Sequence, residues 1–328
     1  MLRPGPLNLI TDVPGLSVGH ATDPEAATGV TTLLLPDFWP AGVDIRGGGP
    51  GVRETAALEP DSLNGRAHAV VLSGGSVFGL AAADGVTAAL SQRGVGLKLF
   101  AKSPHIPIVP AAVLHDLANE GDKNWGLEPP YRALGLASVE AVGHAFSLGS
   151  VGAGRGAAAG RIKGGIGSAS LDLGDGIMVG ALVAANPVGS VLMPDGRTYW
   201  AWPFEFDEEF GGHRPSGAAG AHDPLPDQSR LIQIGRLQAG ANTTIAVVAA
   251  SAALTSAECK RLAIMAQDGI ARAVRPAHTP FDGDTVFAVA DGVALPPPGM
   301  ERSLQIARLG SAAADCLARA IARAAHHA

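Results

Sequence analysis

The sequence has little charge, few aromatic residues and only two cysteines. Asp, Glu, Lys and Arg make up 16% of its 328 residues, below the roughly 25% that is usual in globular domains. No cluster of basic residues occurs, and the net charge is −6, so we expect neither nucleic acid nor an anionic membrane surface as a partner. Cys259 and Cys316 both fall in segments that we predict to be helical, so no disulfide framework is implied.

Long apolar runs and targeting signals are also missing. The chain has no run of about 18 apolar residues, which argues against a membrane-spanning helix. Residues 1–15 lack the apolar segment of a secretory signal peptide, so we expect a soluble, cytoplasmic protein. The chain does have 47% hydrophobic residues and 44 glycines, enough for a large core. Burial of surface in oligomer contacts would explain the low charge, and a GC-rich genome would explain it equally well.

Hydrophobic periodicity and turn residues indicate a mixed α/β chain. We predict strands at 30–35, 68–72, 176–185, 243–250 and 285–290, and helices at 77–92, 131–145, 255–275 and 302–325. Ser76 is expected to cap the first helix, and Thr255 with Glu258 predicts a capping box. The polar, Gly- and Pro-rich segment 204–227 is the best candidate for a mobile linker or an exposed loop.

The junction Asn242-Thr243 is the most informative chemical feature, because small residues lead there into a stiff strand. A Thr hydroxyl at this point can lie close to the preceding carbonyl and attack it, which gives an ester by an N-to-O acyl shift. Hydrolysis then frees Thr243 as a new N-terminus, whose α-amine has a reference pKa of about 7.7–8.0. Such an amine can take the proton from its own Oγ. Alone, the dipeptide is far more often an ordinary strand start.

Three more polar residues stand beside predicted strands. Asp282 and Asp284 flank a glycine before the strand at 285–290, where they could hold an ammonium group, orient a hydroxyl or pass a proton. The same residues are also typical of a turn or of a site for a hard cation. Asn186 ends a predicted strand just before Pro187, where its amide could donate to an oxyanion or simply begin a turn.

Short motifs spread over nearly the whole chain carry a family resemblance. They are DVPG (12–15), VGH (18–20), DIRGG (44–48), LSGGSVFGL (72–80), GAG (152–154), KGGIG (163–167), NPVG (186–189), NTTI (242–245) and HTPFDGDT (278–285). In this order they resemble the DmpA and β-peptidyl aminopeptidase family, which includes the 6-aminohexanoate-oligomer hydrolases.

The resemblance implies a four-layer α/β/β/α sandwich in one hydrolase domain, residues 1–328, that cuts itself into residues 1–242 and 243–328. It implies that Thr243 is the nucleophile, that Asp282 and Asp284 orient it, and that Asn186 stabilises the oxyanion. The Asn242-Thr243 junction is similar to the Thr-type, nylon-oligomer-like members. Homo-oligomers of the cleaved pairs are implied. Short peptides, amino acid amides or esters, and β- or ω-amino acid oligomers are the implied substrates, and no metal or organic cofactor is required.

Two positions depart from the family pattern. His115 stands where some members have a Tyr, and could either replace its hydrogen bond or only line the pocket. Arg161 stands at the place of a Lys thought to assist cleavage; Arg keeps the charge but is no proton acceptor, and Lys163 lies nearby. We also expect Ser73-Gly74-Gly75-Ser76 to form a strand-to-helix turn whose exposed amides line the substrate pocket.

Two other functions fit part of the sequence. Residues 152–157 (GAGRGA), with Asp172 further on, match a dinucleotide-binding fingerprint and would indicate an oxidoreductase. That fingerprint must open a helix, however, and the glycines at 160, 164, 165 and 167 would break it. An inactive, family-like binding or assembly protein is the second alternative. Its mark would be the loss of Thr243, Asp282 or Asp284, and all three are present.

Overall fold

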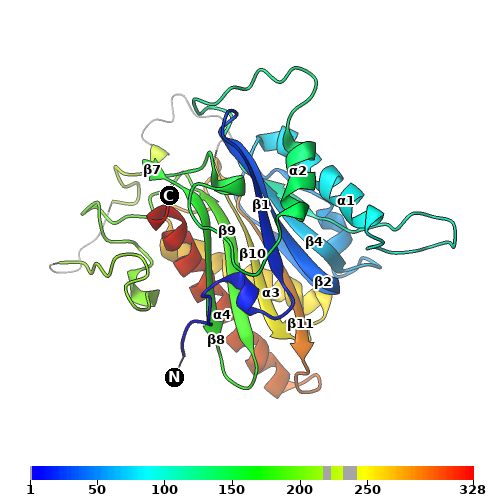
Figure 1. The fold of residues 1–328 in the computed structure, drawn as a ribbon. Helices are drawn as coiled ribbons and strands as arrows, with labels where there is room; N and C mark the ends of the chain where they lie inside the picture. Colours follow the sequence, from blue (N-terminus) through cyan, green and yellow to red (C-terminus); the bar gives the residue numbers. More distant parts are fainter. Residues whose placement is uncertain (1, 217–222, 232–241) are drawn as a thin grey trace.

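The structure is a computed structural model that describes residues 2–216, 223–231 and 242–328. Two β-sheets form its centre, and the long strand β2 (Thr28–Ile45) belongs to both (Figure 1). The first part of β2 pairs with β1 (Ser17–Asp23) and β4 (Arg66–Ser73), followed by β5 (Ala111–Val113) and β3 (Val52–Arg53). From Ala41 onward β2 pairs with β11 (Thr285–Val293), and the sheet continues through β10 (Thr243–Ala252), β9 (Met178–Asn186) and β8 (Gly165–Asp172).

Helices cover the outer faces of both sheets. The helices α3 (Ser256–Ala273) and α4 (Met300–His326) pack on the sheet of β8 to β11, in an apolar cluster that includes Leu262. The helices α1 (Ala82–Gln92) and α2 (Tyr131–Glu140) pack on the other sheet, in a cluster that includes Val86. A third cluster, with Leu72 and Val247, fills the space between the sheets. The four-layer α/β/β/α sandwich is therefore confirmed.

Short elements connect these layers. They are the 3₁₀ turns η1 (Ile10–Asp12), η2 (Thr55–Leu58), η3 (Ser76–Ala81), η4 (Gly152–Gly154) and η5 (Trp202–Phe204), and the strand pair β6 (Ala158–Ala159) and β7 (Ile162–Lys163). Because η4 leads into β6 and not into an α-helix, the dinucleotide-binding interpretation is wrong. Asp172, which that interpretation would place on a ribose, forms an ion pair with Arg3.

The local predictions succeed where they depend on neighbours in the chain. Each predicted strand and helix overlaps an observed one, and the capping box is confirmed, since Thr255 Oγ1 accepts a hydrogen bond from the Glu258 N–H at 3.3 Å. The predicted Ser76 cap is wrong. Gly75 holds the N-cap position of η3, and Ser76 has a positive φ of 51° because it still belongs to the turn.

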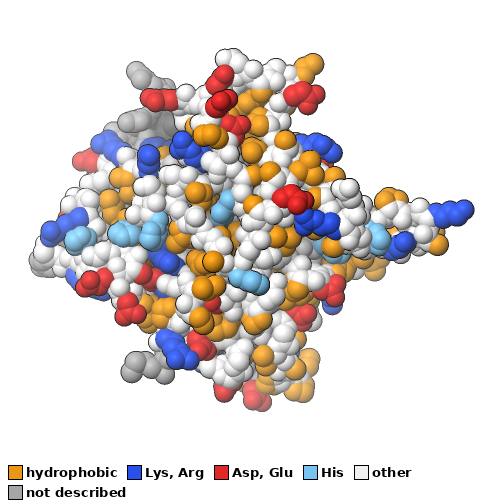
Figure 2. Space-filling model, in the orientation of Figure 1, with side chains coloured by type: hydrophobic (Ala, Val, Ile, Leu, Met, Phe, Trp, Pro, Cys, Tyr) orange, Lys and Arg blue, Asp and Glu red, His pale blue; other side chains and the backbone are white. Residues whose placement is uncertain are grey.

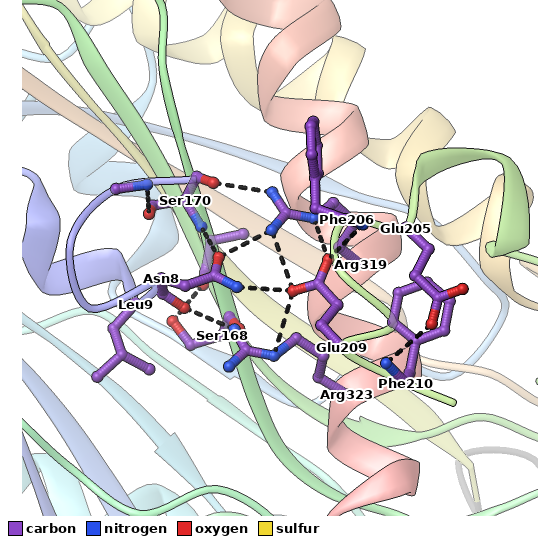
Figure 3. A network of polar contacts seen from close by, with 12 residues as sticks. Asn8, Leu9, Ser168, Ser170, Glu205, Phe206, Glu209, Phe210, Arg319 and Arg323 are labelled. Atoms are coloured by element: carbon purple, nitrogen blue, oxygen red, sulfur yellow. Dashed lines mark hydrogen bonds and ion pairs between the residues drawn. The ribbon is translucent and has the colours of Figure 1, made fainter. Parts of the chain in front are cut away.

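The first part of the segment 204–227 is anchored to the rest of the protein and is not the mobile linker that its composition predicts. Phe210 is only 2% exposed, and Glu209 is bound by Arg319 of α4 at 2.6 Å. Figure 3 shows how Asn8, Arg319 and Arg323 converge on this glutamate. Composition misses this anchoring because the partners lie more than a hundred residues away in the chain. Residues 217–222 lie outside the described part of the chain.

The surface agrees with the composition. Figure 2 shows acidic and basic side chains interspersed over one face, without a large area of one sign. Cys259 and Cys316 are buried and free, as predicted. Within the described residues, no helix is both long enough and apolar enough to span a bilayer.

Candidate active site

The candidate site lies at the end of the sandwich where β10 and β11 begin and β9 ends. Register brings its residues together: Thr243, the first residue of β10, pairs with Asn186, the last residue of β9. Asp284 immediately precedes β11, which runs parallel to β10, and Asp282 forms an isolated bridge with Asn242. All five residues are at most 2% exposed. The sheet therefore gathers every residue that the sequence proposed for the reaction itself.

The Thr243 hydroxyl lies against the peptide group that it is expected to attack. The chain is continuous here, and Thr243 Oγ1 donates a hydrogen bond to the Asn242 carbonyl oxygen at 2.5 Å. The same oxygen accepts a hydrogen bond from the Gly283 N–H at 3.0 Å. That distance suits a donor that stabilises an oxyanion. The Asn242 carbonyl oxygen thus accepts hydrogen bonds from both the Thr243 hydroxyl and the Gly283 N–H.

Close approach explains why residue 283 is glycine. A Cβ atom there would lie 2.9 Å from Thr243 Oγ1 and 2.5 Å from the Gly49 carbonyl oxygen, which leaves no room for a side chain. The Gly49 N–H in turn donates to the Asp282 carbonyl oxygen at 2.9 Å. The glycine-rich segment 47–51 is therefore packed directly on the site, and Gly283 is a functional residue that the sequence analysis did not single out.

Asn242 is held in an unfavourable environment. Its side chain is completely buried, and neither its Oδ1 nor its Nδ2 has a hydrogen-bond partner among the described residues. Leaving a buried polar group unpaired costs about 1–3 kcal/mol. Among the described residues, nothing offsets this cost at the continuous junction.

The two aspartates organise the backbone around the nucleophile. Asp282 Oδ1 accepts a hydrogen bond from the Val188 N–H at 3.1 Å, and its Oδ2 accepts one from Thr279 Oγ1 at 2.6 Å. Asp284 Oδ1 accepts a hydrogen bond from the Thr244 N–H at 2.7 Å. Burial, with a smaller contribution from the Asp284 charge, raises the pKa of Asp282 to about 6. In the described residues of this continuous chain, neither carboxylate hydrogen-bonds to the Thr243 hydroxyl.

Asn186 is oriented by contacts on both ends of its carboxamide. Its Oδ1 accepts a hydrogen bond from the Ala158 N–H at 3.0 Å, and its Nδ2 donates to the His115 carbonyl oxygen at 3.2 Å. A carboxamide nitrogen carries two N–H groups, and the described residues offer an acceptor for one of them. The oxyanion role expected of Asn186 stays a prediction.

Arg230 supplies a positive charge that the sequence analysis missed. Its Nη2 donates to the carbonyl oxygens of Ala158 and Pro187, each at 2.8 Å, and to that of Asn186 at 3.1 Å. Burial lowers the pKa of Arg230 to about 10, while the Asp282 charge acts in the opposite direction. Nothing in its local sequence signals this role, because all of its partners come from other parts of the chain.

His278 is a second residue whose place only the structure shows. Its Nδ1 lies 2.8 Å from Asp284 Oδ2, and its backbone N–H donates to the same oxygen at 3.2 Å. A carboxylate that orients an imidazole is an arrangement suited to moving protons. In the sequence, His278 is only the first residue of the motif HTPFDGDT (278–285), and no role was predicted for it.

The remaining candidates contribute less directly. His115 reaches Asn186 through its backbone carbonyl, and its side chain makes no described hydrogen bond. Arg161 and Lys163 have exposed side chains, with no described contact to Thr243. The predicted exposed amides of the turn Ser73–Ser76 are wrong: the N–H groups of Gly74, Gly75 and Ser76 donate to Gly29, Asp116 and Leu114 within the protein. Packing turns them inward, and the Gly75 N–H supplies a donor to Asp116, which is only 3% exposed.

Comparison with known proteins identifies the family of the chain. Residues 8–328 match peptidase family S58. An uncharacterized aminopeptidase of Mycobacterium tuberculosis is 42% identical, over 96% of this chain and 92% of its own. A 6-aminohexanoate-oligomer endohydrolase of Kocuria is 31% identical, over 96% and 85%. The structure of the L-aminopeptidase D-Ala-esterase/amidase of Ochrobactrum anthropi, described as a variant of the Ntn hydrolase fold, has a TM-score of 0.67 at 23% identity and covers 98% and 86%.

Proposed function

The chain belongs to peptidase family S58, and from this we propose that it is an amidohydrolase that cuts its own backbone before Thr243 and then uses this residue as its nucleophile. One observation carries the proposal. The Thr243 hydroxyl lies 2.5 Å from the Asn242 carbonyl oxygen, and the Gly283 N–H donates to that same oxygen. Family membership alone would not supply this geometry.

Self-cleavage proceeds in two balanced steps. Thr243 Oγ adds to the Asn242 carbonyl carbon, and the Gly283 N–H stabilises the oxyanion. Collapse breaks the peptide C–N bond, and the proton lost by Oγ passes to the departing nitrogen. Asn242 thereby becomes an ester on Thr243 Oγ, and the Thr243 nitrogen becomes a free amine. Water then hydrolyses the ester to a carboxylate and a free hydroxyl. Residues 243–328 stay with residues 1–242 because β10 and β11 are strands inside one sheet.

The matured site hydrolyses substrates by the same chemistry. The Thr243 amine takes the proton from Oγ as Oγ attacks the substrate carbonyl, and Asn186 donates to the oxyanion. The amine of the substrate takes this proton from the Thr243 amine and departs. Water then hydrolyses the acyl ester, which releases the acid and restores the Thr243 hydroxyl. Asp284 fixes the strand through Thr244, while Asp282 holds the turn after Asn186 through Val188.

The substrates proposed are short peptides, amino acid amides or esters, and β- or ω-amino acid oligomers. Relatives named as an aminopeptidase and as a 6-aminohexanoate-oligomer endohydrolase support this range. We also propose that the cleaved pairs form homo-oligomers, in line with the low charge of the chain. The cytoplasm is the proposed compartment, since the two free cysteines fit a reducing environment.

Mass spectrometry combined with an amide assay tests the proposal. We expect the purified protein to give two masses, those of residues 1–242 and 243–328, and to hydrolyse amino acid amides or 6-aminohexanoate oligomers. Activity should rise in step with the cleaved fraction. A fully active protein with an unbroken chain would contradict the mechanism, since Thr243 would then have no amine to act as its base.

Arg230 gives a pH-dependent prediction. The Arg230 charge favours ionised Asp282, so Arg230→Gln should raise the pKa of Asp282 further above its ordinary value. If the ionised carboxylate is the active form, the acidic limb of the kcat/KM profile, expected near the Asp282 pKa of about 6, moves to higher pH. Arg230→Gln also removes the hydrogen bond from Arg230 to the Asn186 carbonyl oxygen. We expect the resulting displacement of Asn186 to lower kcat by about 10- to 100-fold.

The controls for this experiment separate charge from packing. Arg230→Lys keeps the charge and should return the acidic limb toward its original pH, while Arg197→Gln, on the exposed surface, should change nothing. The cleaved fraction is measured by mass in each variant, so that rates refer to matured sites. An unshifted limb in Arg230→Gln would show that this guanidinium does not act on Asp282.

A further inference from the structure

The turn just before β11 contacts the backbone on both sides of Thr243. The Gly283 N–H donates to the Asn242 carbonyl oxygen at 3.0 Å, and Asp284 Oδ1 accepts a hydrogen bond from the Thr244 N–H at 2.7 Å. The first contact fixes the peptide group before Thr243, and the second fixes the peptide group after it. Because the nucleophile lies between them, its position depends on how firmly the Asp284 carboxylate is held.

His278 holds the other oxygen of this carboxylate. Its ring Nδ1 lies 2.8 Å from Asp284 Oδ2, and its backbone N–H donates to the same oxygen at 3.2 Å. His278 has a positive φ of 55°, a conformation that is uncommon outside glycine. Strained backbone of this kind persists where the surrounding structure holds it in place. Here it brings two nitrogen atoms of one residue onto one carboxylate oxygen.

The imidazole ring is not needed to build the turn itself. Three backbone hydrogen bonds from the segment 46–49 hold the turn: the N–H groups of Arg46, Gly48 and Gly49 donate to the carbonyl oxygens of Asp284, Thr279 and Asp282 at 2.7, 3.2 and 2.9 Å. The His278 side chain is 23% exposed, whereas that of Asp284 is 2% exposed. Loss of the ring should therefore release the Asp284 carboxylate and leave the backbone of the turn in place.

We propose that His278 is a positioning residue for the Thr243 nucleophile and that it acts through Asp284. Its ring and its backbone N–H hold one carboxylate oxygen, so that the other oxygen stays on the Thr244 N–H and keeps Thr243 Oγ beside the carbonyl group that it attacks. The contact serves both self-cleavage and substrate hydrolysis, because the Thr244 N–H is present before and after the junction is cut. The inference rests on the proposed amidohydrolase function and adds a residue to its machinery.

Two substitutions of His278 separate the contribution of the ring from that of the backbone. His278→Gly keeps the backbone N–H and tolerates the positive φ, but it has no ring. His278→Asn also tolerates this φ, and its carboxamide can donate to Asp284. The full chain is made by cell-free synthesis, and its conversion into two fragments is timed on denaturing gels. For an amino acid amide, kcat and KM are then measured on the matured protein.

The expected result is a loss of rate without a loss of binding. His278→Gly should lower both the rate constant of self-cleavage and kcat by about 10- to 100-fold, the effect of a misplaced reacting group, with little change in KM. His278→Asn should recover most of both rates. His213→Gly makes the same change at an exposed position of another loop and should alter neither rate.

The outcomes separate this inference from the function on which it rests. Unchanged rates in His278→Gly would overturn it, and so would a His278→Asn protein as slow as His278→Gly, because a hydrogen bond to Asp284 would then not be what matters. If His278→Gly does not fold, a loss of kcat of about tenfold or more in His278→Asn overturns the inference. In these cases the unmutated protein still matures and hydrolyses amides. If it does neither, the proposed function itself fails.

Discussion

Replacement of Thr243 by alanine is expected to leave the chain in one piece and without hydrolytic activity. The hydroxyl that contacts the Asn242 carbonyl oxygen at 2.5 Å would be gone, and with it both the cleavage and the amine that cleavage creates. The loss should amount to the whole measurable rate, since the nucleophile and its base disappear together. Intact mass and an amide assay on the purified variant provide the measurement.

Thr243→Ser is the matched variant, because it keeps the hydroxyl and removes only a methyl group. It should still mature and retain hydrolytic activity, at a reduced rate if the β-branched side chain helps to hold Oγ against the carbonyl. A Thr243→Ala protein that appears as two fragments ending and beginning at this junction would show that another group performs the cleavage. The assignment of the nucleophile would then have to be abandoned.

Glu209→Gln is expected to destabilise the fold by about 3–5 kcal/mol, the usual cost of removing one partner of a buried ion pair. Arg319 is completely buried. Its Nε and Nη2 donate to the two Glu209 oxygens at 2.6 and 3.0 Å (Figure 3). Asn8 donates to the same carboxylate at 2.7 Å. Without the negative charge, the Arg319 guanidinium would be buried and uncompensated.

This effect is measured by urea unfolding with Glu209→Gln introduced into the Thr243→Ala protein. That protein is expected to stay uncleaved, so its unfolding involves one chain and no dissociation of fragments. Glu208→Gln makes the same chemical change at an exposed neighbour and should alter stability by less than about 0.5 kcal/mol. Equal midpoints for the two variants would show that the network around Arg319 contributes little. A large loss would show that the segment before the junction is tied to α4 and to the N-terminal region.

Sequence reasoning worked best where one residue acts through its own neighbours. The run of β-branched and small residues in 243–250 predicts β10, and Thr255 with Glu258 predicts the start of α3. It failed at Ser76, where the turn continues past the expected cap, and at the amides of Ser73–Ser76, which Asp116, Gly29 and Leu114 bind internally. The first failure comes from the local turn geometry, and the second comes from partners that are distant in the chain.

The sequence by itself determined the mixed α/β content of the chain, since strands and helices depend on periodicities that are read over a few neighbouring positions. Its ordered motifs predicted the layered sandwich and the chemistry at Asn242-Thr243 through their family resemblance. Only the tertiary structure decided which groups meet Thr243. The Gly283 N–H on the scissile carbonyl, Arg230 beside Asn186 and His278 on Asp284 all result from strand register and loop packing. The physical reason is that these contacts join groups whose separation in space is set by the pairing of β9, β10 and β11, and no local pattern records that pairing.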